Sequence, residues 1–125
     1  MPTVHNKLDH NSELWGLVLA GGDGQRLQDY IRMTGGGDLP KQYVNFVGRR
    51  SMLEHTFERA EQLIPLRQIF TVVSKQHLCH EAVRIQLARP APENVIVQRE
   101  NKETGPGIFL TLMQLYKRCP NATVV

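Results

Sequence analysis

The sequence predicts an α/β fold in which helices cover both faces of a parallel β-sheet. Short apolar runs alternate with longer stretches whose apolar residues recur at helical spacing, in the order strand, helix, strand, helix, strand, helix, strand. The first run, Leu14 to Ala20, is long enough for a strand buried on both faces, as strands of parallel sheets are. With 125 residues and no internal repeat, the chain is expected to form one domain, residues 14–125, after a flexible polar arm, residues 1–13.

The first strand leads into a long connection, residues 21–42. Long loops in compact domains are usually functional or disordered. This one is expected to contain one short helical turn, and residues 43–47 to form a short extended segment that ends at Gly48. The residues that suggest the helical turn are Leu27, Tyr30, Ile31 and Met33.

A helix is expected after residue 51, because Ser51 and Glu54 have the spacing of a capping box. In such a box the serine side chain binds a backbone N–H of the first turn, and the glutamate reaches back to the serine backbone. Pro65 ends this helix. Its apolar stripe for the core consists of Met52, Leu53, Phe57, Ala60, Leu63 and Ile64.

The second buried strand is predicted at residues 69–73. Ser74 is the expected cap of a second helix, residues 75–88, which Pro90 ends. This helix is expected to turn inward Leu78, Ala82 and Ile85.

A third short strand is predicted at residues 95–97, and a fourth begins at residues 122–125. The helix between them ends near Cys119, and its apolar residues are Ile108, Phe109, Leu112, Met113 and Tyr116. In the usual doubly wound order the fourth strand lies beside the first. We expect this arrangement to leave an open sheet edge through which the chain forms a homo-oligomer.

Three glycines in four residues follow the first strand, in Gly21-Gly22-Asp23-Gly24. Glycine can take positive φ, and it lets another molecule approach the backbone closely. Arg26 follows at once, and Lys41 comes after a second glycine cluster. Backbone N–H groups with two nearby cations describe a cradle for a polyphosphate. A tight strand-to-loop turn without a ligand is the alternative.

Two better-known phosphate motifs do not fit. Gly16 and Gly21 have P-loop spacing, but Gly22 stands where that motif has lysine. The dinucleotide fingerprint needs a third glycine after Gly22-x-Gly24, where this chain has Leu27. The relevant pattern is therefore GGxGxR after a buried strand.

Three sequence blocks resemble the sugar-1-phosphate nucleotidyltransferases, and most closely the mannose-1-phosphate guanylyltransferases. The blocks are Leu19-Ala20-Gly21-Gly22-x-Gly24-x-Arg26-Leu27, then Pro40-Lys41-Gln42-Tyr43, and Asn101 to Ile108, which is similar to that branch's Gly-Arg-Asn-Thr-Ala-Pro-Ala-Ile segment. The resemblance covers only the front of such an enzyme. It implies a Rossmann-like three-layer sandwich of the nucleotide-diphospho-sugar transferase type, incomplete at its C-terminal side.

The resemblance also implies an activity: transfer of a nucleoside monophosphate from a nucleoside triphosphate, GTP by this resemblance, to a sugar 1-phosphate such as mannose 1-phosphate, with release of pyrophosphate. Arg26 would stabilise the departing pyrophosphate, and Lys41 the α-phosphate or the incoming sugar phosphate. Asp23 either stabilises the turn or helps to hold Mg²⁺, and Thr104 is also the expected N-cap of the last helix. The nucleotide-binding residues would be Leu19, Ala20, Gly21, Gly22, Asp23, Gly24, Gln98, Thr104 and Gly105.

Some features depart from the family pattern. Gln28-Asp29-Tyr30 replaces an early proline, and the third block has Asn101, Glu103 and Gly105 where the family has Gly, Asn and Ala. These changes leave the choice of base and sugar open. The resemblance implies Mg²⁺ as cofactor, with its main aspartate ligand after residue 125, so this chain alone is expected to be inactive. The alternative function is a non-catalytic module that binds a nucleotide or a protein partner.

Composition excludes several other classes. The net charge is +3, and Lys and Arg form no run of five, which argues against nucleic-acid binding. The stretch of 18 apolar residues needed to span a membrane is missing, and the polar start is not typical of a signal peptide. Cys79 and Cys119 lack CxxC spacing, which fits reduced cytosolic thiols better than a disulfide scaffold. His77, Cys79 and His80 do not share one helix face in a ligand geometry, so they are expected to pack rather than to bind zinc. We therefore expect a cytoplasmic protein.

Overall fold

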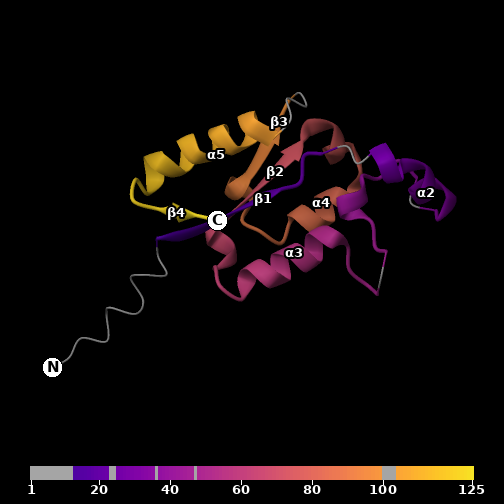
Figure 1. Ribbon diagram of the computed structural model, residues 1–125, viewed down its shortest axis with the longest axis horizontal. Coiled ribbons are helices and arrows are strands. Elements are labelled where there is room, and N and C mark those ends of the chain that lie inside the picture. The colour runs from indigo at the N-terminus through magenta and orange to yellow at the C-terminus, as the bar shows by residue number, and fades with distance from the viewer. Residues whose placement is uncertain (1–12, 23–24, 36, 47, 100–103) are drawn as a thin grey trace.

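The computed structural model describes residues 13–22, 25–35, 37–46, 48–99 and 104–125 (Figure 1). Its centre is a sheet of four parallel strands in the order β3-β2-β1-β4. The strands are β1 (Leu14–Leu19), β2 (Ile69–Ser74), β3 (Val95–Gln98) and β4 (Thr123–Val124). The fourth strand lies beside the first as predicted, and this order is the one with which Rossmann-like sheets begin.

Helices cover both faces of the sheet, so the predicted three-layer α/β class is confirmed (Figure 1). One face carries α3 (Met52–Glu61) and α4 (Glu81–Leu87), and the other carries α5 (Thr104–Arg118). Two hydrophobic clusters fill the spaces between the layers. The strand β2 contributes to both, with Ile69 and Val73 toward α3 and α4, and with Phe70 and Val72 toward α5. All six of its residues are therefore buried.

The first strand is less buried than the sequence predicts. Only Gly16 of β1 is buried, and Leu19 is 49 % exposed. The reason is the position of β4, which pairs only with Leu14 and Trp15 and leaves the later part of β1 uncovered on that side by any described strand.

The connection after β1 contains α2 (Gln28–Met33), which confirms the predicted helical turn. The expected extended segment over 43–47 is wrong at its start, because Tyr43 ends a 3₁₀ turn, Lys41–Tyr43. Tyr43 is buried in the cluster beneath α3 and α4. Because the Tyr43 side chain packs in this cluster, the backbone forms a turn there instead of an extended segment.

The capping box at the start of α3 is confirmed. Glu54 N donates to Ser51 Oγ, and the Ser51 backbone N–H donates to Glu54 Oε1, each at 3.1 Å. The helix ends at Glu61, earlier than predicted. Leu53, Phe57 and Ile64 are buried, whereas two residues of the predicted stripe, Met52 and Leu63, are exposed.

The helix predicted over residues 75–88 is instead two elements. A 3₁₀ turn, Lys75–Cys79, precedes α4, and the extended backbone of His80 separates them. Because of this break, α4 presents a different side to the core from the continuous helix that was predicted. Val83 and Leu87 are buried, whereas Ile85 and Ala82 are exposed. Ser74 precedes the 3₁₀ turn but makes no capping hydrogen bond with its side chain.

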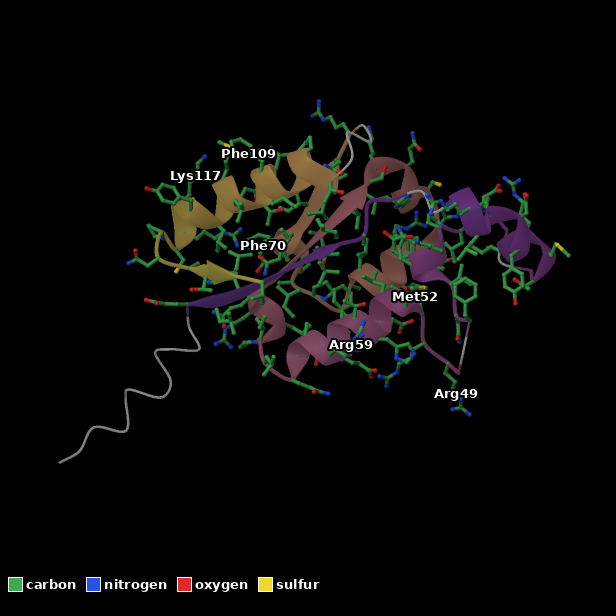
Figure 2. The ribbon with its side chains drawn as sticks, in the orientation of Figure 1. Arg49, Met52, Arg59, Phe70, Phe109 and Lys117 are labelled. Atoms are coloured by element: carbon green, nitrogen blue, oxygen red, sulfur yellow. The ribbon has the colours of Figure 1, made fainter. Side chains whose placement is uncertain are left out.

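The apolar stripe predicted for the last helix is not the side that packs on the sheet. The buried residues of α5 are Gly107, Thr111 and Leu115, which recur every fourth residue. The larger apolar residues Phe109, Leu112, Met113 and Tyr116 are exposed. Figure 2 shows Phe109 and Lys117 on the side of α5 turned away from the sheet, and Phe70 between α5 and the sheet. Across the described residues, no helix is both long and apolar enough to cross a membrane.

Candidate functional site

The described start of the glycine cluster lies at the carboxyl edge of the sheet, where β1, β2 and β3 end. It consists of Ala20, Gly21 and Gly22, and we call it the glycine turn. A β-carbon built on Gly21 would lie 3.2 Å from Gln98 Oε1 at the end of β3, whereas one on Gly22 would meet no atom within 4 Å. Neither glycine has positive φ, so at these two positions the close approach, and not the backbone conformation, is what glycine provides. Glycine at position 21 permits close approach to Gln98, and Gly22 faces open space.

The carbonyl groups of this turn are held by two adjacent side chains from the Pro-Lys-Gln-aromatic block. Gln42 Nε2 donates to Ala20 O at 2.7 Å and to Gly22 O at 2.8 Å. Tyr43 OH donates to Ala20 O at 3.1 Å. The 3₁₀ turn Lys41–Tyr43 is thus fastened to the glycine turn, and we call this connection the strap, consisting of Gln42 and Tyr43.

Tyr43 anchors the strap in the core. Its side chain is nearly fully buried, its ring meets the His77 ring edge-on, and its hydroxyl lies 3.4 Å from His77 Nδ1. Burial raises the pKa of the Tyr43 phenol above its ordinary range, and a hydrogen bond with Gln42 opposes this shift only in part. From α4, Gln86 Nε2 donates to Tyr43 O at 3.0 Å, and Ser51 Oγ donates to Gln86 Oε1 at 2.6 Å.

A cleft of about 440 Å³ opens beside the glycine turn. Its walls are the carboxyl half of β1, the turn with Gly22, the segment with Lys41 and Gln42, and the start of α3. Its size falls in the range of small-ligand sites. The structure therefore brings Gly22 and the exposed Lys41 to one cleft. Among the described residues that line it, Arg26 is absent; that residue lies exposed in the 3₁₀ turn Gln25–Leu27.

Gln98 lies on the other side of Gly21. Its side chain is only 6 % exposed, and its Nε2 is buried with no hydrogen-bond acceptor among the described residues. A β-carbon on Gly107 would come within 2.8 Å of this nitrogen and within 2.9 Å of Val72 Cγ1. The carboxamide of Gln98 is therefore held between the two glycines with an unused donor. An unpaired buried donor is costly unless a ligand satisfies it.

The remaining predicted residues are at the same edge or outside the described part. Thr104 and Gly105 are exposed in the first turn of α5; Thr104 is the first helical residue, not the residue before the helix. Leu19 and Ala20 line the cleft. Asp23 and Gly24 lie outside the described residues. Within the described residues, no group of three or more His, Cys, Asp or Glu could hold a metal ion.

Sequence reasoning missed the roles of Gln42, Tyr43 and Gly107. Gln42 and Tyr43 belong to the Pro-Lys-Gln-aromatic block, so a local signal was present, but their contacts span more than twenty residues of sequence. For Gly107, the signal was a small residue four positions before Thr111 on one helix face.

The sequence matches no family model. It is 27 % identical over 103 residues to Xanthan biosynthesis protein XanB of Xanthomonas campestris pv. campestris (strain B100). It is 26 % identical over 98 residues to the mannose-1-phosphate guanylyltransferase of Klebsiella pneumoniae, and 26 % identical over 111 residues to that of Escherichia coli (strain K12). These alignments cover 82 %, 78 % and 89 % of this chain.

The chain spans about a fifth of the length of the curated relatives it matches, since the aligned part is 21 %, 20 % and 22 % of them. The matches and the parallel α/β sheet agree with the three sequence blocks. The resemblance of this chain to the mannose-1-phosphate guanylyltransferases, and through them to the sugar-1-phosphate nucleotidyltransferases, is therefore confirmed.

Proposed function

We propose that this chain is the triphosphate-binding front portion of a nucleotidyltransferase that transfers GMP from GTP to mannose 1-phosphate and releases pyrophosphate. The names of its relatives support the reaction class and the sugar phosphate. The base is proposed as guanine for the same reason.

One observation carries the proposal: the glycine turn lies between an unused buried donor and a cleft with a cation. Among the described residues, Gln98 Nε2 has no acceptor on the side of α5, and Lys41 lines the cleft on the side of α3. A nucleotide laid across the turn would give Gln98 a base acceptor and would place its phosphates over the open space at Gly22. Leu19 to Gly24, with Thr104 and Gly105, would border the nucleotide.

The proposed transfer of a nucleoside monophosphate requires positive charge at the phosphates and no protein nucleophile. An oxygen of the sugar phosphate attacks the α-phosphorus of the triphosphate, the bond from that phosphorus to the β-phosphate oxygen breaks, and pyrophosphate leaves. Two anions must approach each other, and positive charge offsets their repulsion. Lys41 would act on the α-phosphate or the incoming phosphate, and Arg26 on the departing pyrophosphate.

We also propose Mg²⁺ as the partner of the triphosphate, as the resemblance implies. The described residues offer no cluster of acidic, histidine or cysteine ligands for it, so no step is assigned to the metal. A cytoplasmic location is proposed from the same resemblance and from Cys79 and Cys119, which are free thiols.

The decisive experiment is a titration of the chain with GTP, ATP, CTP and UTP by calorimetry. We expect GTP to bind, and Lys41→Met to weaken binding by about tenfold, because a charge-assisted contact to phosphate is lost. Lys117→Met is the matched control, since Lys117 is on the outer side of α5 (Figure 2), and it should bind as the wild type does. If no triphosphate binds, the proposal is wrong.

Pyrophosphate release from GTP and mannose 1-phosphate is the second readout. The isolated chain is expected to release little, so rapid release would show that the active site had been misplaced. In a longer protein that contains this chain, binding without any release would instead support the non-catalytic module.

A further inference from the structure

We propose that Gln42 and Tyr43 are positioning residues that hold the glycine turn with its carbonyl oxygens inward and its N–H groups outward. The proposal rests on the proposed function only in its claim that these N–H groups bind the phosphates of a nucleotide. Its structural part concerns the orientation of peptide groups at Ala20 and Gly22.

The strap engages alternate carbonyl groups of the turn. Both hydrogens of one amide nitrogen, Gln42 Nε2, are used, one for Ala20 O at 2.7 Å and one for Gly22 O at 2.8 Å. Tyr43 OH adds a second donor to Ala20 O. Two neighbouring side chains thus bind the turn at two places two residues apart.

The direction of these carbonyls matters for an anionic ligand. A peptide oxygen carries partial negative charge, so a carbonyl that faced a phosphate would repel it, whereas the N–H at the other end of the peptide attracts it. Glycine adopts many backbone conformations at little cost, so nothing in Gly21 or Gly22 itself prevents a peptide flip. Side-chain donors from elsewhere in the fold must therefore select the orientation.

The strap is rigid enough for this task because it is fixed at its other end. Tyr43 is 2 % exposed and packs on His77, and its carbonyl accepts from Gln86, which also accepts from Ser51 at the start of α3. The same 3₁₀ turn carries Lys41 into the cleft with Gly22. One segment thus sets both the peptide orientation and the position of the cation.

The test replaces the donor by an acceptor of the same shape. In Gln42→Glu an oxygen would face the two carbonyl oxygens, and the turn should reorient. The N–H of Gly21 belongs to the same peptide as Ala20 O, which both strap residues hold. Its one-bond N–H residual dipolar coupling reports the orientation of that peptide without any ligand, and we expect it to differ from that of the wild type. Affinity for GTP should fall by about tenfold or more. Thermal unfolding should remain a single cooperative transition.

Gln28→Glu is the matched control, because Gln28 Nε2 also donates to a glycine carbonyl, Gly37 O at 3.1 Å, but in the neighbouring loop. It should change neither the coupling of Gly21 nor the affinity for GTP. Gln42→Met removes the donor without adding charge, and it decides the question if Gln42→Glu does not fold. Tyr43→Phe should enlarge the change in the Gly21 coupling when combined with Gln42→Met.

The outcomes separate this proposal from the proposed function. If Gln42→Met and Gln42→Glu leave the coupling of Gly21 unchanged, the positioning role is overturned, whatever the nucleotide affinity. If the coupling changes but the wild type binds no triphosphate, the strap stands and the proposed function is wrong. A changed coupling together with unchanged GTP affinity would overturn the link between peptide orientation and binding.

Discussion

Gly105 and Gly107 lie two residues apart in the first turns of α5, but a β-carbon would meet different surroundings at each. At Gly105 it would meet no atom within 4 Å, whereas at Gly107 it would press on Gln98 Nε2 and Val72 Cγ1. We expect Gly107→Ala to lower the free energy of unfolding by about 1–3 kcal/mol, because Val72 is a stiff β-branched residue in a fully buried strand.

The matched change Gly105→Ala should raise the free energy of unfolding by up to about 1 kcal/mol, since alanine favours the helix and loses less entropy. Urea unfolding of the two variants measures both. Equal changes in the free energy of unfolding for the two variants would show that α5 does not approach Val72 and Gln98 closely at Gly107.

Tyr43 gives a prediction about pH. Burial raises the pKa of its phenol above the ordinary value of about 10, so the folded state holds this proton more tightly than the unfolded state. The resulting stability is complete below the unfolded pKa and is lost as the pH rises above it toward the folded pKa. Above about pH 10 the free energy of unfolding should fall by up to about 1.4 kcal/mol per pH unit from this one group.

The variant Tyr43→Phe lacks this titration, so the difference in unfolding free energy between it and the wild type isolates the effect. All other side chains are the same in the two proteins, so their contributions cancel in this difference. Urea unfolding of both proteins between about pH 8 and pH 11 makes the measurement. A difference that stays constant over this range would mean that the phenol is not buried.

At the scale of elements, Ser51 joins α3 to the rest of the site. Its Oγ accepts from Glu54 N and donates to Gln86 Oε1, and Gln86 in turn holds the Tyr43 carbonyl. Ser51→Ala removes the cap and leaves Gln86 with one partner fewer. We expect a loss of about 1–2 kcal/mol in the free energy of unfolding, from the cap in particular.

Thr56→Ala on the same helix is the control for Ser51→Ala. Its hydroxyl donates to the helix's own Met52 carbonyl and accepts a long, exposed hydrogen bond from Arg59 Nη2 at 3.4 Å, so the change should stay within about 0.5 kcal/mol. Chemical denaturation of the two variants tests the comparison. If both lose the same amount, the capping box contributes nothing beyond a generic hydroxyl.

The sequence patterns predicted the elements of this fold better than their faces. The alternation of apolar runs with helical stretches predicted each of the four described strands, and Ser51 with Glu54 located the start of α3. The error at α5 has a physical cause. Its buried side consists of Gly107, Thr111 and Leu115, and Leu115 is the one large apolar residue among them. The helix approaches the sheet so closely at Gly107 that a β-carbon there would lie 2.9 Å from Val72 Cγ1. The larger residues on the opposite side then dominate the helical periodicity, and the pattern selects the wrong stripe.

The candidate site was predictable in its residues but not in its contacts. The glycine turn and Lys41 follow from local motifs, and the structure brings Gly22 and Lys41 to one cleft. The strap depends on contacts between residues about twenty positions apart, which no local pattern encodes. Likewise, the close approach of Gly21 to Gln98 depends on β1 and β3 ending at the same edge.

At the scale of the whole molecule, β4 covers only the first part of β1 at the β4 edge of the sheet. Strand β4 pairs with Leu14 and Trp15, and Leu17 N donates to Val125 O. Ala20 N faces β2, since it donates to Val72 O; by alternation, Leu19 N–H faces the other way, toward the β4 side. No described strand covers β1 there. Uncovered backbone groups on an apolar strand attract further strands.

We therefore propose that the chain self-associates through the uncovered end of β1, and light scattering over a range of concentrations should detect a dimer. Leu19→Lys should give a monomer, because lysine at an edge opposes pairing, and Leu19 is already half exposed. The outer face of α5 is another exposed apolar surface of the described residues, so Tyr116→Lys is the control and should remain dimeric. A monomeric wild type contradicts the proposal. Loss of the dimer in Tyr116→Lys alone would assign the contact to α5, because the sheet edge is unchanged in that variant.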